Sequence, residues 1–117
     1  MRANHLGFLA GNYVVTFEAA DATPAAVTTC AAPCTSAQVG TRDLDEWRIE
    51  LRRRIPSAAA YIRWDPANPS WVNVAMAWVE PQSPPRAAGD DLVCDALVGA
   101  GATIPANYRC YQTRVFP

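Results

Sequence analysis

Residues Trp71 to Val79 read W-V-N-V-A-M-A-W-V, and the fold can be built outward from them. β-Branched and aromatic residues dominate this stretch, and it holds no Gly, Pro or charge, which predicts a central β-strand. At a period of two, the bulky side chains fall on one face and smaller ones on the other. We expect the bulky face to pack on a helix and the other face to be lightly covered. The bulky set is Val72, Val74, Met76 and Trp78, and the opposite set is Trp71, Asn73, Ala75, Ala77 and Val79.

One long amphipathic helix is predicted upstream of this strand. A hydroxyl at Thr35 and an amide three residues later at Gln38 fit a capping box, so the helix should begin there, with a weak point at Gly40. Pro56 should end it, because proline disfavours helical geometry in the preceding residue. Apolar residues at helical spacing form the stripe that should pack on the sheet: Leu44, Trp47, Leu51 and Ile55.

Three further strands are expected, over Tyr13–Phe17, Ala58–Trp64 and Asn107–Val115. A short turn joins the second of these to the central strand, which makes those two antiparallel neighbours. The chain from Glu80 to Asp91 is rich in Pro, Ser, Gly and Asp and is predicted to be a solvated loop. No helix is predicted between that loop and the last strand.

The first residues, Met1 to Phe8, show no capping residue or initiating turn, as if a helix had been cut in its interior. Gly7 and then Gly11 should end that helix. His5 is the single histidine, and with no partner suggested by its neighbours we interpret it as a solvated residue at a helix end.

Length and charge limit the functional classes. The 117 residues suit one domain, residues 1–117, and the net charge of -1 gives no overall field to attract nucleic acid. All ten basic residues are arginine, and Arg52, Arg53 and Arg54 form the only run. Because that run lacks interleaved aromatic residues, we interpret it as a favourable helix end and expect no nucleic-acid partner.

Four cysteines indicate a disulfide framework: Cys30, Cys34, Cys94 and Cys110. Three pairings are possible, and joining sequence neighbours closes the shortest loops, so Cys30–Cys34 with Cys94–Cys110 is favoured. Free buried thiols and a zinc site are the alternatives, although zinc needs tighter ligand clusters than Cys94 and Cys110 provide. Disulfides imply an oxidising compartment. The sequence shows no signal peptide or membrane span, so we expect that an upstream targeting or anchoring segment has been removed.

Catalytic and metal-binding motifs are missing from the sequence. It has no nucleophile elbow, phosphate loop or His/Cys ligand cluster, so we expect neither an enzyme nor a cofactor. Asp90, Asp91 and Asp95 could offer oxygens to calcium, but their spacing lacks the EF-hand glycine and terminal glutamate. A solvated turn is the preferred interpretation.

Several short phrases, in order, resemble the minor pilins of type IV pili, and most closely the type IV pilus modification protein PilV family. These are Met1–Asn4 closing an amino-terminal helix, C-T-S-A-Q at 34–38, D-L-D-E-W at 43–47, Ile55-Pro56, Ala77-Trp78 before a cysteine-bounded loop, and C-Y-Q-T-R-V-F-P at 110–117. Two features depart from the family: Ser57-Ala58-Ala59 stands where a glycine-rich turn is common, and the apolar amino-terminal half-helix is missing.

The resemblance implies an α+β, pilin-like fold: a truncated amino-terminal helix and a second helix on an antiparallel sheet, with a disulfide-closed carboxy-terminal region. It implies a non-catalytic subunit, processed by a prepilin peptidase and held in the inner membrane through the missing helix, facing the periplasm. Its partners would be other minor pilins, the major pilin and a tip adhesin, in a complex that primes assembly and ends at the fibre tip. The alternatives are a minor pseudopilin of a type II secretion system and a secreted disulfide-bonded binding module.

Overall fold

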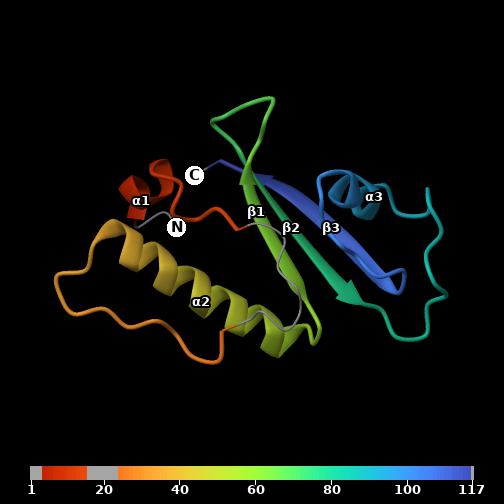
Figure 1. The fold of residues 1–117 in the computed structure, drawn as a ribbon, viewed down its shortest axis with the longest axis horizontal. Helices are drawn as coiled ribbons and strands as arrows, with labels where there is room; N and C mark the ends of the chain where they lie inside the picture. Colours follow the sequence, from red (N-terminus) through yellow and green to blue (C-terminus); the bar gives the residue numbers. More distant parts are fainter. Residues whose placement is uncertain (1–3, 16–23, 117) are drawn as a thin grey trace.

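A computed structural model describes residues 4–15 and 24–116. Its elements, in chain order, are α1 His5–Leu9, α2 Ser36–Arg54, β1 Ala59–Trp64, β2 Val72–Val79, α3 Leu92–Gly99 and β3 Tyr108–Val115 (Figure 1). The three strands form one antiparallel sheet in the order β1-β2-β3. Helices α1 and α2 lie on one side of the sheet and α3 on the other (Figure 1). The fold is therefore α+β, as predicted.

The central position of β2 is confirmed. It pairs with β1 from Val72 to Ala77 and with β3 over its whole length. The strand predicted at 58–64 is its antiparallel neighbour on one side, and the strand predicted at 107–115 is its neighbour on the other. The sheet therefore follows the order of the sequence, although a loop and α3 intervene between β2 and β3.

Helix α2 begins and ends where the sequence predicts. The Thr35 side chain accepts a hydrogen bond from the Gln38 backbone N–H, and the Gln38 side chain accepts one from the Thr35 N–H, which completes the capping box. Ile55, before Pro56, is extended and closes the helix. Gly40 is no weak point: it is buried, and a Cβ there would lie 3.2 Å from the backbone oxygen of Asn12.

One core lies between the α1–α2 side and the sheet. Its buried residues are Phe8, Tyr13, Leu44, Ile62 and Val72, and Val74, Trp47 and Trp64 border it. Of the predicted helix stripe, Leu44 is buried, whereas Trp47, Leu51 and Ile55 are half-buried. Val72 is the buried member of the predicted bulky strand face, and Met76 and Trp78 are half-buried.

The expectation that the second face of β2 is lightly covered is wrong. Ala75 and Ala77 on that face are fully buried, in a second core with Tyr61, Cys94 and Leu97. Because Ala75 and Ala77 are small, α3 can pack close to β2, and this packing buries both alanines. The sheet is thus covered on both sides over much of β2.

Helix α3 was missed in the sequence analysis. It has only eight residues, and apolar residues surround most of its circumference, so no helical period stands out. Its start is marked by Asp91, whose side chain accepts hydrogen bonds from the backbone N–H groups of Val93 and Cys94. Asp91, a residue type that often caps helices, was the one feature of the sequence that indicated where α3 begins.

The amino-terminal region also differs from expectation. Asn4 caps α1 and accepts a hydrogen bond from the Gly7 N–H, so this helix does have a capping residue. His5 begins α1, and Gly7 lies inside it. Of the strand predicted at 13–17, Val15 forms one antiparallel bridge with Ile62. Residues 16 and 17 lie outside the described residues.

Candidate functional site

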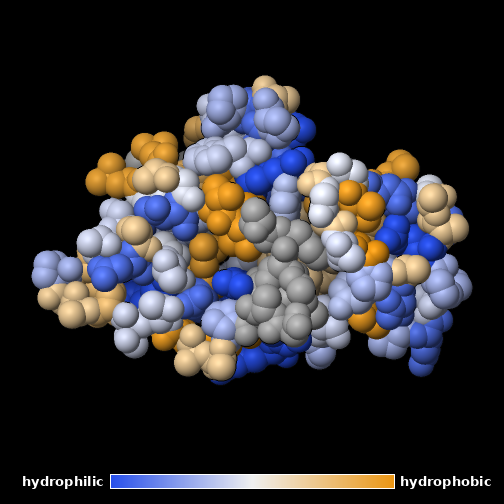
Figure 2. Space-filling view, viewed as in Figure 1, coloured by the Kyte–Doolittle hydropathy of each residue, from blue (hydrophilic) through white to orange (hydrophobic). Residues whose placement is uncertain are grey.

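An exposed apolar surface lies on and just after α1, and we call it the α1 surface. Leu6 is 72% exposed and Leu9 is 61% exposed, and Val14 adds to the exposed apolar area. Figure 2 shows hydrophobic side chains gathered over this helix at one end of the molecule. Exposed leucines side by side on one short helix are candidates for contact with another protein.

Two contacts hold the α1 surface in place, one against α2 and one against β1. The Asn4 side-chain amide donates to the Ser36 carbonyl over 2.7 Å, which ties the start of α1 to the first residue of α2. Phe8 turns inward and meets the Trp64 ring edge-on, with centroids 4.7 Å apart. The inner side of α1 is thus anchored in the core while Leu6 and Leu9 remain outside.

The four predicted cysteines form two disulfides, Cys30–Cys34 and Cys94–Cys110, which is the favoured pairing. The first closes the turn directly before α2. The second joins α3 to β3, and Cys94 is completely buried. The carboxy-terminal region is therefore closed covalently onto the last strand, as predicted.

The protein itself supplies hydrogen-bond donors to the three aspartate carboxylates that could have bound calcium: Asp90, Asp91 and Asp95. Asp91 binds backbone N–H groups of α3 and of Cys110, and Asp90 accepts from the Ala87 N–H. Asp95 forms an ion pair with Arg86 at 2.9 Å. Its carboxylate also accepts a hydrogen bond from the backbone N–H of Gly89. Asp91 also lies near the sulfurs of Cys94 and Cys110, but these form a disulfide and offer no thiolate to a metal.

The arginine run at the end of α2 has local partners. Arg52 donates to the Ala58 carbonyl, and Arg53 and Arg54 both lie within ion-pair distance of Glu50. These contacts fit the interpretation of a stabilised helix end. Glu46, the other acidic residue of this face, is exposed and lies 3.9 Å from Arg42.

A groove of about 400 Å³ lies beside α2, between that helix and the preceding loop. Its walls combine small apolar residues with charged residues that already pair along the helix. The lining residues are Ala25, Ala26, Val27, Glu46, Ile49, Glu50 and Arg53.

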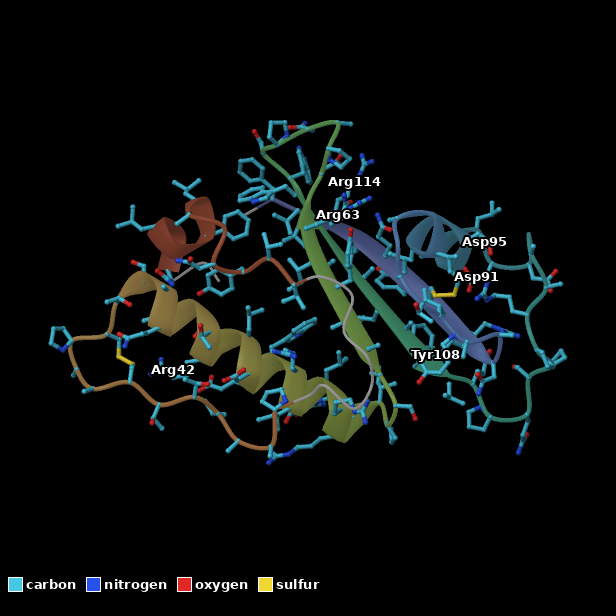
Figure 3. All side chains as sticks on the ribbon, viewed as in Figure 1. Arg42, Arg63, Asp91, Asp95, Tyr108 and Arg114 are labelled. Carbon is cyan, nitrogen blue, oxygen red and sulfur yellow. A yellow bond between two sulfur atoms is a disulfide. The ribbon has the colours of Figure 1, made fainter. Side chains whose placement is uncertain are left out.

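One polar feature depends on strand register and was not predicted. Arg63, Asn73 and Arg114 are direct neighbours across β1, β2 and β3, and we call them the arginine row. The row lies on the same sheet face as Ala75 and Ala77. Figure 3 shows Arg63 and Arg114 close together at one end of the sheet, with Asp91 and Asp95 beside α3.

Buried and aromatic neighbours position the arginine row. Asp65, only 3% exposed, pairs with the Nε of Arg114 at 3.0 Å. The Arg63 guanidinium lies 5.4 Å from the centre of the Tyr61 ring. Asn73, between the two arginines, accepts a hydrogen bond from the Gln112 side chain. The geometry presents two cations on one side of the sheet.

Comparison with known proteins gives no relative: no family model, curated protein or solved structure matches this chain. Among the described residues, no helix combines the length and the hydrophobicity needed to span a bilayer.

Proposed function

We propose that this chain is the folded domain of a minor pilin, a structural and non-catalytic subunit. The observation that carries the proposal is a helix packed on an antiparallel sheet together with a disulfide-closed carboxy-terminal region. Helix α2 lies along one side through Leu44, and the Cys94–Cys110 disulfide closes the carboxy-terminal region on the other. This is the arrangement that the resemblance to the PilV family leads us to expect.

The α1 surface supports a role in assembly. Exposing Leu6 and Leu9 to water is unfavourable unless another surface covers them, and burial stabilises by about 25 cal/mol per Å² of apolar area. The same short helix is anchored to α2 by Asn4, so a partner would meet a preformed surface. We propose that other minor pilins and the major pilin contact the α1 surface, in a complex that primes pilus assembly and carries an adhesin at the fibre tip. The full-length protein would sit in the inner membrane, facing the periplasm, before it enters the fibre.

The test is a fibre assay in the organism that encodes the chain. Deleting the gene should reduce the pili sheared from the cell surface, and the wild-type gene should restore them. A Leu6→Glu/Leu9→Glu variant should fail to restore them, because two charges would enter a subunit contact. Leu92→Glu is the matched control, since Leu92 is 76% exposed on α3, outside the α1 surface. Normal piliation in the deletion strain would overturn the proposal.

The alternatives give different results in the same strain. If the chain is a minor pseudopilin, deletion should block type II secretion and leave pili intact. If it is a secreted binding module, both pili and secretion should be unaffected. Arg114, whose side chain is 65% exposed, favours this last alternative as a second candidate, because a binding module needs an accessible polar site.

A further inference from the structure

The outer edge of β3 has free hydrogen-bonding capacity. Cys110 donates its backbone N–H to Asp91, so this N–H points away from β2. Because successive residues of an antiparallel strand alternate in direction, Gln112 and Arg114 must also direct their N–H and C=O groups outward. No described residue bonds to these backbone groups, and both residues are exposed. The edge can therefore accept another strand over this stretch.

The sheet face that reaches this edge carries excess positive charge, with Arg114 on β3 itself. Arg63 and Arg114 stand on either side of Asn73, two strand spacings or about 10 Å apart. Among the described residues, Asp65 is the one carboxylate that pairs with either arginine, and it pairs with Arg114. Within the described part of the chain, two guanidinium groups thus share one carboxylate, which leaves this face net positive, with Arg114 next to the open edge.

Both arginines keep side-chain donor groups that no described residue binds. The Arg114 side chain remains 65% exposed although its Nε is paired. The Nε of Arg63 is buried and has no hydrogen-bond partner among the described residues. The Arg114 guanidinium therefore keeps exposed donors beside the edge, and a carboxylate on an added strand could accept hydrogen bonds from them and balance their charge.

We propose that the β3 edge binds an extended acidic peptide segment of a partner protein, which adds to the sheet as a fourth strand. Its backbone would pair with Gln112 and Arg114, and an Asp or Glu side chain on the same face would meet the Arg114 guanidinium. An acidic polysaccharide could supply the carboxylate but not the strand pairing, so the open edge favours a peptide. The inference is independent of the fibre role, because it concerns an edge and a face that the α1 surface does not include.

The experiment is an NMR titration of the whole domain with an acetylated peptide of about ten alternating Thr and Asp residues, to about 1 mM. Backbone amide shifts should cluster on β3. Arg114→Glu should weaken binding at least about tenfold, because it removes a charge-assisted contact and adds repulsion. Gln112→Pro should weaken binding as strongly, because it removes an outward N–H from an edge position where a sheet tolerates proline.

Three controls make the result decisive. Arg53→Glu changes the same charge on α2 and should leave the affinity within about twofold. A peptide with Lys in place of Asp should not bind. Oligogalacturonate tests the acidic polysaccharide alternative. That alternative predicts that oligogalacturonate binds, that Arg114→Glu abolishes this binding, and that Gln112→Pro leaves it unchanged. If these results are obtained and the acidic peptide causes no amide shifts, the proposal is wrong. No peptide binding by folded wild-type protein, or unchanged binding by Arg114→Glu, would also overturn it.

Discussion

The backbone N–H of Cys110 donates to the carboxylate of Asp91 over 3.2 Å, across 19 residues of chain. The same carboxylate caps α3 through the N–H groups of Val93 and Cys94. One side chain therefore fixes the start of the helix and its position against β3, at the point where the disulfide also joins them.

Replacing Asp91 by Ala should lower the free energy of unfolding by about 1 to 3 kcal/mol, because a helix cap is lost and the Cys110 N–H loses its acceptor. Urea denaturation followed by circular dichroism measures the change. Asp90→Ala is the control: that side chain holds one N–H in an exposed loop, and its loss should cost less than about 0.5 kcal/mol. Equal effects of the two substitutions would contradict the role assigned to Asp91.

Removing the Cys94–Cys110 bridge should destabilise the domain by about 2 to 5 kcal/mol. The bridge spans 16 residues, so breaking it frees a sizeable loop in the unfolded chain, and its buried end lies in the second core. Cys30–Cys34 spans only four residues and should contribute less, about 2 kcal/mol by the same chain-entropy relation. The check compares unfolding midpoints of the two Cys→Ser double variants. An unchanged midpoint for Cys94→Ser/Cys110→Ser would show that this bridge does not stabilise the fold.

Local signals account for the parts of the fold that sequence reasoning predicted. The capping box at Thr35 and the proline at 56 act within a few residues, so they define α2 without knowledge of the rest. The β-branched run at 72–79 is long enough to identify β2. By contrast, α3 owes its stability to Cys94 and Leu97 packing on the sheet, and eight residues are too few for a periodic signal.

The arginine row could not be read from the sequence, because it depends on register. Its members, Arg63, Asn73 and Arg114, come from three strands, and a shift of one residue in either pairing would send an arginine to the opposite face. The burial of Ala75 and Ala77 was missed for a related reason. Small residues look like a lightly covered face until the covering helix is known.

Gly40→Ala should destabilise the domain, even though alanine favours helices over glycine by about 1 kcal/mol. The added Cβ would lie 3.1 Å from the Cβ of Asn12 and 3.2 Å from its backbone oxygen, so the segment after α1 would have to move. We expect a net loss of about 1 kcal/mol from this overpacking. Gly99→Ala is the matched control: Gly99 lies in α3, and an added Cβ would have no described atom from outside its own helix and chain neighbours within 4 Å, so the substitution should be neutral or stabilising. Thermal denaturation of both variants measures the contrast, and a stabilised Gly40→Ala would refute the close approach of Asn12 to α2.

Deprotonation of Tyr13 should lower the free energy of unfolding at alkaline pH. Its ring is 2% exposed, and its hydroxyl donates to the Asp43 carboxylate over 2.5 Å. Burial, followed by this hydrogen bond, raises the pKa of Tyr13 above its usual 10.0, while a hydrogen bond with the Asn4 side chain acts in the opposite direction. The folded state therefore holds the phenol proton more tightly than the unfolded state does.

The sign of the effect follows from this raised pKa. Below the unfolded pKa of 10.0 both states are protonated and the contribution to stability is fully present. As the pH rises from there through the folded pKa, the unfolded state loses its proton first and the domain loses stability. Tyr13→Phe should flatten this decline, because phenylalanine has no phenol proton to lose. Urea midpoints measured at several pH values on either side of 10.0 provide the check. Equal slopes in wild type and Tyr13→Phe would show that Tyr13 does not cause the decline.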